Sequence, residues 1–474
     1  MIRRVLPAAA GIGLVLFASH AALLGLPFHW DELGYFIPAA LDVYRLGAWV
    51  PVHTLANIHP PGLAACLAAV WSAVGYSIVV TRAAMLLLGT LAAVAAGLLG
   101  FELTGKRSVA AGAVLLLAAS PLFFTQSMMA QLDLPAALFG TLALWCFLRG
   151  RYAWSAAACT AAVLMKETSL AAPLVFGMWL MKDRQWRRAA LFGVPVLALA
   201  GWVLVLRHAT GNAAGNAEFG WYNIVYPLHP ARLAGAVLRR VSYLFVEEFR
   251  WIGSIALVLG WRRGMFRSRP WRVAWSYAAA QAVLVTVLGG AVLERYLLPV
   301  LPVLYAGHAA SFRRRWMLPT AVAGLVASLF WNPPFWPFPP ENNLAMVDFV
   351  RVQQAGAGWL EQHPAEGPVA TAWPFTDALR VPDFGYVRRA VAVEPLEDFS
   401  AASLGGKSIR TLALYSRDWD PPANLLRTRW VEPIYRRYFG YRPPITGSEL
   451  TRVHGLHRVA RWSRRGQWME IWTR

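Results

Sequence analysis

The sequence has few cysteines and few charged residues, and both shortages narrow the class of protein. Its 474 residues include three cysteines, Cys66, Cys146 and Cys159, all inside apolar runs. This number and placement encode no disulfide framework and no zinc site. Charged residues make up 15% of the chain, hydrophobic residues make up 57%, and the mean hydropathy is +0.43. This balance excludes an ordinary soluble protein and predicts a polytopic membrane protein.

Acidic residues are the scarcer of the two signs, and the formal net charge is +20. Residues 1–331 carry 27 lysines and arginines against 11 aspartates and glutamates, a net charge of +16, whereas residues 332–474 carry 18 against 14, a net charge of +4. In the first part the basic residues form short clusters between apolar runs, as loop charges that orient membrane helices do. We therefore expect membrane lipids, and no nucleic acid, as partners.

The segment 332–474 lacks a glycine-rich phosphate loop, a metal-spaced histidine cluster and a GxSxG motif. It begins with a stiff, proline-rich stretch. Its periodicity predicts a small α/β domain outside the membrane with a recognition or packing role. We expect helices at 343–363 and 423–438, strands at 368–373, 390–394 and 411–415, and a hairpin at 457–462 and 467–472.

Twelve apolar runs precede that domain, and the positive-inside rule decides which of them span the membrane. They lie at 5–27, 62–80, 83–103, 108–125, 134–148, 152–166, 168–181, 189–206, 247–261, 273–292, 296–312 and 316–331. If all twelve span, every basic cluster after the first falls on the wrong face. If 62–80 lies in the interface or re-enters the membrane, all clusters become cytoplasmic and eleven spans remain. The first run resembles a signal peptide, but its length and the many later spans favour an uncleaved helix.

This topology brings a set of ionisable groups to the outer face, near loops 28–82 and 208–246. They are Asp31, Glu32, His59, Arg82, Asp133, Lys166, Glu167, Arg207, His208, Glu294 and Arg295. Charge at membrane depth is costly and usually marks a substrate or ion path. An acidic juxtamembrane loop is the plain alternative for Asp31 and Glu32. A converging set of such groups is what a lipid-linked substrate needs.

Four motifs carry a resemblance to a known family. They are Asp31-Glu32 after the first helix, His59-Pro60-Pro61-Gly62, Leu132-Asp133-Leu134-Pro135, and Glu294-Arg295-Tyr296-Leu297-Leu298-Pro299. In this order and spacing the chain resembles membrane glycosyltransferases that use polyprenyl-phosphate sugars. This GT-C superfamily contains the protein O-mannosyltransferases, the aminoarabinose transferases of lipid A, and the bacterial family 39 and Rgt-like enzymes. The motifs cover residues 1 to about 312.

The resemblance implies that an acceptor hydroxyl attacks the anomeric carbon of a sugar held on a lipid phosphate, with inversion. Asp31 is then the candidate base, with Glu32 and Asp133 beside it in the catalytic set. Fixed cations should face the departing phosphate, and Arg295 and Arg82 are the candidates. The implied substrate-binding set also includes His59, where the aminoarabinose enzymes have a lysine, together with Lys166 and Tyr296.

Each of these residues also has a structural interpretation. Glu32 can simply orient Asp31, and Asp133 can be an ordinary helix-start charge. Lys166 can terminate a short helix, and Arg295 can anchor at the interface by snorkelling. A divalent cation held by Asp31, Glu32 and Asp133 stays open, because no spacing requires one, and no other cofactor is indicated.

The predicted fold is therefore an α-helical polytopic membrane protein of GT-C type, with about 11 transmembrane helices and a small C-terminal α/β extracytoplasmic domain. The predicted domains are 1–331, the transmembrane glycosyltransferase domain, and 332–474. We expect a plasma-membrane enzyme whose active site faces outside, with a glycan, lipid or protein acceptor. The alternative is a transporter or flippase for a lipid-linked or anionic substrate, although no internal repeat supports it. A scaffold or sensor would leave the membrane-level carboxylates unexplained.

Overall fold

The chain divides into two compact units in the computed structural model, which describes residues 2–421 and 423–474. The helical unit comprises Met1–Ala22, Pro38–Tyr76 and Val80–Leu329, and the sheet unit comprises Leu23–Ile37, Ser77–Val79 and Phe330–Arg474. The segment that carries Asp31 and Glu32 therefore belongs with the C-terminal part of the chain.

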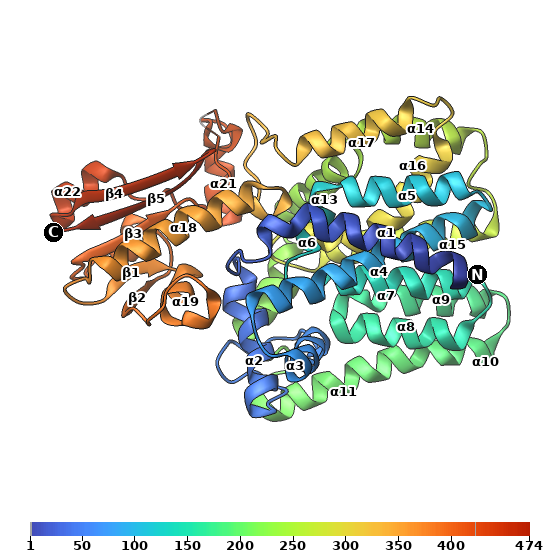
Figure 1. The fold of residues 1–474 in the computed structure, drawn as a ribbon, viewed down its shortest axis with the longest axis horizontal. Coiled ribbons are helices and arrows are strands. Elements are labelled where there is room, and N and C mark those ends of the chain that lie inside the picture. The colour runs from blue at the N-terminus through green and yellow to red at the C-terminus, as the bar shows by residue number, and fades with distance from the viewer. Residues whose placement is uncertain (1, 422) are drawn as a thin grey trace. The chain divides into compact units, whose positions relative to one another are not determined.

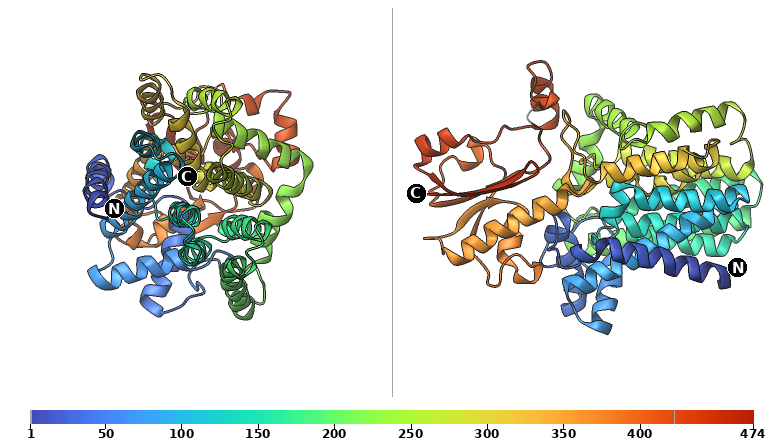
Figure 2. Two further views of the ribbon diagram at one scale, coloured as in Figure 1. Left: turned by 90° about the vertical axis from the view of Figure 1, so that its right-hand side faces the viewer. Right: turned by 45° about the horizontal axis from the view of Figure 1, so that its top comes forward.

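The helical unit is a bundle in which helices that are distant in the chain often pack together. Its helices are α1 (Ile2–His20), α2 (Ile37–Leu46), α3 (Gly62–Val74), α4 (Ile78–Thr104), α5 (Arg107–Ala119), α6 (Pro121–Gln126), α7 (Asp133–Leu148), α8 (Tyr152–Met165), α9 (Ala171–Lys182), α10 (Trp186–Ala189), α11 (Gly193–Thr210), α12 (Ala217–Gly220), α13 (Pro230–Phe245), α14 (Trp251–Arg262), α15 (Arg269–Val287), α16 (Leu301–Ser311) and α17 (Met317–Ser328). Helix α8 packs on both α7 and α11, α5 packs on α16, and α9 packs on α15 (Figures 1 and 2).

Within the described residues, three helical stretches are long and apolar enough to cross a membrane, namely Leu6–Leu23, Ile78–Thr104 and Trp186–Thr210. Several other helices are apolar but shorter. Large apolar side chains such as Leu14 and Leu197 are more than 70% exposed, as expected for helices that face lipid. Helix α3 has 13 residues, so it is about 20 Å long and shorter than the roughly 30 Å hydrocarbon core.

Basic loops gather at one end of the helical unit. At the helix ends that flank these loops, contacts occur from Arg149 to Glu102 (3.7 Å), from Arg188 to the Tyr152 ring (5.3 Å) and from Arg269 to Asp183. They join the α4–α5, α7–α8, α9–α10 and α14–α15 connections. Helix α7 starts at Asp133 and has 16 residues, so Asp133 lies about 24 Å from that basic end.

The part of the sheet unit that the structure describes contains five strands in the order β2-β1-β3-β5-β4. The strands are β1 (Val369–Ala372), β2 (Val393–Leu396), β3 (Thr411–Tyr415), β4 (His457–Arg464) and β5 (Gln467–Thr473). Strand β1 is parallel to both β2 and β3, whereas β5 is antiparallel to β3 and β4. The long helix α18 (Ala345–Gln362) packs on β4 and β5, and the short helices are α19 (Phe375–Arg380), α20 (Ala401–Leu404), α21 (Glu432–Phe439) and α22 (Gly447–His454) (Figure 1).

Most elements predicted for this part of the chain are confirmed, including the helix near 343–363, the strand at 411–415 and the C-terminal hairpin. Two predictions are displaced. The strand expected at 390–394 begins at Val393, because the Val391 amide donates to the Leu379 carbonyl instead of pairing in the sheet. The helix expected at 423–438 begins at Glu432, because Pro433 fits only the first turn of a helix.

The segment Leu23–Ile37 is held within the sheet unit by specific contacts. The Tyr386 hydroxyl donates to the Phe28 carbonyl at 2.8 Å. The His29 ring meets the Phe349 ring edge-on, with centroids 5.1 Å apart. These contacts fix the backbone on which Asp31 and Glu32 are carried.

Candidate active site

Asp133, the first residue of α7, is buried between two cations. Lys166 Nζ lies 2.5 Å from Asp133 Oδ1, and Arg295 Nε lies 3.3 Å from Oδ2. Lys166 follows the end of α8, and Arg295 lies in the 3₁₀ helix Glu294–Val300. Three predicted site residues that are far apart in the sequence are therefore brought together at helix ends, where a carboxylate is also favoured by the helix dipole.

Tyr296 provides a ring that several of these cations share. Lys166 Nζ lies 3.9 Å from the ring centroid, and the Cζ atoms of Arg240 and Arg295 each lie 5.6 Å from it. A cation over an aromatic face is attracted to the ring quadrupole, more strongly where water is excluded. The ring thus helps to hold positive charges that would otherwise repel each other.

Helix α13 adds two further arginines to this site. Arg239 Nε is paired with Glu294 Oε1, and Arg240 donates to the carbonyl oxygens of Leu293 and Val285. Arg240 is 3% exposed, and its Nε has no hydrogen-bond partner among the described residues. Burial lowers the pKa of Arg240 to about 10, against the opposing charge of Glu294, so the guanidinium stays charged at neutral pH.

These residues form what we call the cation cluster, which comprises Asp133, Lys166, Arg239, Arg240, Glu294 and Arg295 around Tyr296. Its members are four cations and two carboxylates, and three further carboxylates, Glu167, Glu247 and Glu248, interact electrostatically with them. Guanidinium groups bind the oxygens of phosphates and carboxylates bidentately. The cluster is therefore suited to binding an anion.

His59 lies beside this cluster because its side chain pairs with Glu167, the residue that follows Lys166. His59 Nδ1 is 2.8 Å from Glu167 Oε2, and the Phe219 ring packs edge-on against the imidazole at 5.5 Å. Burial opposes ionisation of Glu167, but the charge and hydrogen bond of His59, with Lys166, hold the pKa of that carboxyl below its usual value. The structure thus joins the first outer loop to the α8–α9 connection.

Arg82 is fully buried near the start of α4. Its guanidinium donates to the carbonyl oxygen of Met128 at 2.7 Å, which lies in the connection between α6 and α7. Arg82 therefore stabilises the backbone that leads into Asp133.

Asp31 and Glu32 are adjacent in the sequence but have different environments in the sheet unit. Glu32 is fully buried, and its Oε2 accepts a hydrogen bond from the His29 amide at 2.8 Å. Asp31 is only half-buried. Trp30 before it has a φ of 49°, an uncommon conformation for a bulky residue. Of the two carboxylates, Asp31 is the more accessible to a substrate.

The structure gives no support to a metal site at the predicted carboxylates. In the part of the chain that is described, no group of three or more histidine, cysteine, aspartate or glutamate side chains is arranged to hold a metal ion. Asp31 and Glu32 belong to the sheet unit and Asp133 to the helical unit.

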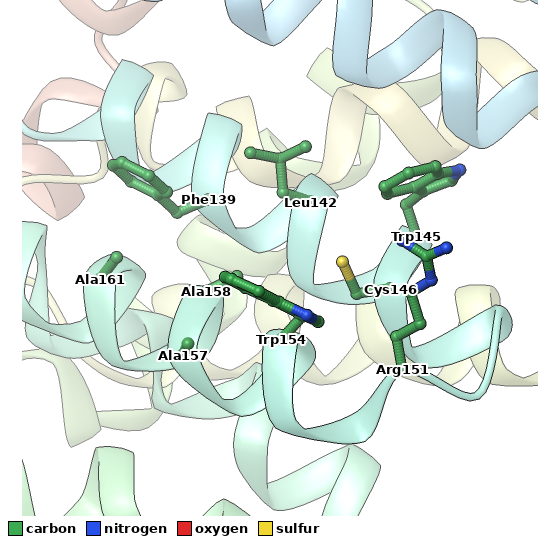
Figure 3. Close-up of a pocket in the computed structure, with 9 residues that line it drawn as sticks. All are labelled: Phe139, Leu142, Trp145, Cys146, Arg151, Trp154, Ala157, Ala158 and Ala161. Carbon is green, nitrogen blue, oxygen red and sulfur yellow. The ribbon is translucent and has the colours of Figure 1, made fainter. Parts of the chain in front are cut away.

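A groove of about 370 Å³ lies on α7 and α8, away from the charged residues of the cation cluster. Figure 3 shows Phe139, Leu142 and Cys146 from α7 facing Trp154 and a row of alanines from α8, with Arg151 at one end. Its lining contains no carboxylate or histidine, so it offers no acid–base chemistry.

Comparisons with known proteins define the class of this fold. A family model described as dolichyl-phosphate-mannose-protein mannosyltransferase matches residues 55–171, which span the His59 and Asp133 motifs. No protein with curated annotation matches the sequence. The solved structures that match include three glycosyltransferase structures.

Two of these are crystal structures of ArnT from Cupriavidus metallidurans. In the one bound to undecaprenyl phosphate, ArnT is 14% identical with a TM-score of 0.58, covering 98% of this chain and 97% of that chain. In the apo state the identity is 15% and the TM-score 0.52, with 98% of each chain covered. AglB from Archaeoglobus fulgidus, in complex with an inhibitory peptide and a dolichol-phosphate, is 11% identical with a TM-score of 0.49, covering 86% of this chain and 69% of that chain.

The family match and the ArnT fold confirm the predicted resemblance to glycosyltransferases of GT-C type. They also confirm a helix-rich membrane protein that carries a small sheet. The likeness to ArnT shows the fold.

Sequence reasoning missed Arg239 and Arg240 in the cation cluster. Both lie in the outer loop 208–246. The signal was present, because two adjacent arginines interrupt an otherwise apolar helical pattern. A pair of charges on an apolar helix has to face a partner or an anion.

Proposed function

We propose that this chain is a multi-pass membrane glycosyltransferase that transfers a sugar from a polyprenyl-phosphate-linked donor to an acceptor hydroxyl. The observation that carries this proposal is the cation cluster, in which Lys166, Arg240 and Arg295 lie around the Tyr296 ring. A sugar phosphate ester of a lipid has the negative charge and the oxygens that such cations bind. The match to a mannosyltransferase family and the fold of ArnT, solved with undecaprenyl phosphate, support the same donor class.

In this proposal the donor phosphate is held by Arg295, Arg240 and Lys166. Charge develops on the phosphate as the anomeric carbon–oxygen bond breaks, so fixed cations stabilise the transition state more than the ground state. Asp133 holds Lys166 and Arg295 in place, and Glu294 holds Arg239. The unsatisfied Nε of Arg240 is a donor already prepared for a phosphate oxygen.

We assign the base role to Asp31. The acceptor oxygen attacks the anomeric carbon, the bond from that carbon to the phosphate oxygen breaks, and the acceptor proton passes to the Asp31 carboxylate. A single displacement of this kind inverts the anomeric configuration. The polyprenyl phosphate leaves with the bonding electron pair, and Glu32 keeps the Asp31 backbone in place through its bond to His29.

We further propose the topology with eleven spans in the plasma membrane. The basic end of the helical unit then faces the cytoplasm, while Asp133 and the sheet unit face outside. The gathering of basic loops at one end of α7 and α8 supports this orientation. Cysteines placed at the exposed positions Lys106 and Glu218 in a chain without native cysteines test it. An impermeant maleimide added from outside should label only Glu218→Cys. Labelling of Lys106→Cys alone would show that the orientation is the opposite one.

The test of function is sugar transfer by the purified protein in detergent, where no membrane is crossed. The donor is a synthetic polyprenyl-phosphate sugar with a radiolabelled sugar. We expect release of the sugar to an acceptor or to water in the wild type and its loss in Arg240→Gln. Binding of the donor without any release would favour a transporter or flippase.

A further inference from the structure

The sheet unit contains a group of aromatic and charged side chains that the proposed chemistry leaves unexplained. We call it the aromatic–carboxylate cluster, and it comprises Trp30, Asp31, Tyr35, Trp373, Asp377 and Arg417. The first five are half-buried and Arg417 is exposed. Solvent can therefore reach a patch whose side chains are otherwise those of a packed core.

Trp373 is the centre of this cluster. Its ring meets the Trp30 ring edge-on at 5.7 Å and the Tyr35 ring at a tilt, with centroids 5.5 Å apart. Arg417 lies over the Trp30 ring with its Cζ 5.7 Å from the centroid. The three aromatic rings are thus fixed at angles to one another and do not stack into a closed core.

The backbone around Trp373 is built for this arrangement. A Cβ at Gly34 would lie 2.3 Å from Trp373 Nε1, so only glycine allows the indole its position. The fully buried Tyr415 donates its hydroxyl to the carbonyl oxygen of Trp373 at 2.9 Å. Trp373 is therefore held from both sides before any ligand arrives.

The carboxylates lie among the rings. Burial raises the pKa of Tyr35, and the charges of Asp31 and then Asp377 add to that rise. Burial also raises the pKa of Asp377, while Arg380 and a hydrogen bond from the Trp373 side chain oppose it. Asp377 thus touches the Trp373 side chain, and both carboxylates lie within electrostatic reach of Tyr35.

The topology of the sheet provides independent support. Strand β2 lies on one side of β1 and β3 on the other, so the chain reverses its direction of winding between β1 and β3. In open α/β sheets, ligands bind outside the carboxyl ends of the strands at such a switch point. Trp373 directly follows β1, and Arg417 follows β3 by two residues.

We propose that the aromatic–carboxylate cluster binds a pyranose ring of a carbohydrate acceptor, so that the acceptor is a glycan and not a peptide. The faces of Trp373 and Tyr35 contact the C–H face of the sugar, because the negative ring face attracts polarised hydrogens. Asp377 and Arg417 bond to neighbouring hydroxyls, since a carboxylate accepts and a guanidinium donates. This inference rests on the proposed function, in which Asp31 takes the proton of an acceptor hydroxyl.

The first test measures sugar binding to the whole 474-residue chain in detergent by saturation-transfer NMR. The probes are methyl glycosides of glucose, galactose, mannose, rhamnose and N-acetylglucosamine. At least one should receive saturation from the wild type. Its affinity should fall roughly tenfold in Asp377→Asn, because a hydrogen bond to a charged group is lost.

Three further variants exclude a trivial loss of folding. Trp373→Phe keeps an aromatic ring and should retain part of the binding, whereas Trp373→Ala should abolish it. Trp430→Ala removes a tryptophan that is 73% exposed in the same unit and should bind like the wild type. The inference is overturned if the wild type binds no glycoside. It is also overturned if Asp377→Asn and Trp373→Ala both bind the glycoside as tightly as the wild type does.

A second measurement separates this inference from the proposed function. Release of sugar from the polyprenyl-phosphate donor to water does not need an acceptor, so it should persist in Asp377→Asn while the KM for a glycan acceptor rises. If the wild type binds glycosides but never releases donor sugar, the proposed function fails and the sugar site stands. If donor sugar is released but transferred to serine peptides and not to glycosides, the sugar site fails.

Discussion

The cation cluster of the helical unit and the aromatic–carboxylate cluster of the sheet unit place charge in opposite ways. In the first, six charged side chains are mostly buried, and ion pairs hold them at the ends of helices. In the second, two carboxylates and an arginine surround three half-exposed rings. The first suits a charged phosphate, which repays the cost of buried cations. The second suits a neutral, hydroxyl-rich ring, which needs flat apolar faces and a few acceptors.

This comparison predicts that changes in the cation cluster should cost stability as well as activity. Asp133→Ala leaves Lys166 and Arg295 facing each other without their shared carboxylate. We expect the free energy of unfolding to fall by about 3–5 kcal/mol and transfer to be lost, as measured by thermal unfolding in detergent and by donor turnover.

The matched control is Asp183→Ala, which breaks the partly exposed pair with Arg269 and should cost less than about 1 kcal/mol. Equal destabilisation by the two variants would show that Asp133 is not the support of the cation cluster.

In the sheet unit we expect a change at Asp31 to affect rate without stability. Asp31→Asn keeps the shape but cannot take the acceptor proton, so turnover should fall by about 10²–10⁴ while the melting temperature stays the same. Glu32→Gln should reverse the pattern, with lower stability and a milder loss of rate, because buried Glu32 bonds to the His29 amide. The two variants are compared by steady-state kinetics and thermal unfolding, and near-wild-type turnover in Asp31→Asn would remove its base role.

A substitution that changes the packing around Trp373 should have a smaller effect on the sheet unit. Gly34→Ala places a methyl group against Trp373 Nε1, and we expect a loss of about 1–3 kcal/mol from overpacking. Glycan acceptor binding should weaken as Trp373 shifts, whereas polyprenyl phosphate binding should not change. Gly11→Ala is the control, because no atom lies within 4 Å of its added Cβ. An unchanged acceptor affinity in Gly34→Ala would mean that the position of Trp373 is not critical.

The smallest expected effect is on the stability of the protein at acid pH. The pKa of Glu167 is held below its usual value by His59 and Lys166 despite burial. The stability from this pair is therefore present above the ordinary carboxyl pKa of about 4.3 and is lost as the pH falls toward the lowered value. His59→Gln should lower the melting temperature slightly at pH 6 and reduce the further decrease between pH 5 and 4. An identical pH profile for His59→Gln and wild type would show that the pair contributes nothing.

The charged motifs at helix ends were readable from the sequence, because Asp133, Lys166 and Arg295 each adjoin an apolar run that a helix must bury. Their convergence was not, since it depends on how helices distant in the chain pack. Arg239 and Arg240 were not predicted as site residues, because α13 lies in a stretch that was interpreted as a loop. In the sheet unit, no local sequence pattern marks Trp373 and Asp377 as site residues. The parallel pairing of β1 with β2 and β3 is what brings them into the aromatic–carboxylate cluster. Sequence reasoning placed residues 23–27 in the first apolar run and residues 28–37 in the outer loop 28–82. Contacts with Phe349 and Tyr386 place this segment with the sheet unit.

The most direct test of the account is the binding of a short-chain polyprenyl phosphate, without sugar, to the purified protein by isothermal titration calorimetry. Arg295→Lys keeps the charge but loses the planar fork and should weaken binding, and Arg295→Ala should weaken it more. Arg240→Gln should also weaken it by roughly tenfold or more, because a charge-assisted bond to phosphate is lost. Asp31→Asn and Trp373→Ala, in the sheet unit, should bind like the wild type. Wild-type affinity in both Arg240→Gln and Arg295→Ala would contradict the central claim that the cation cluster holds the donor phosphate.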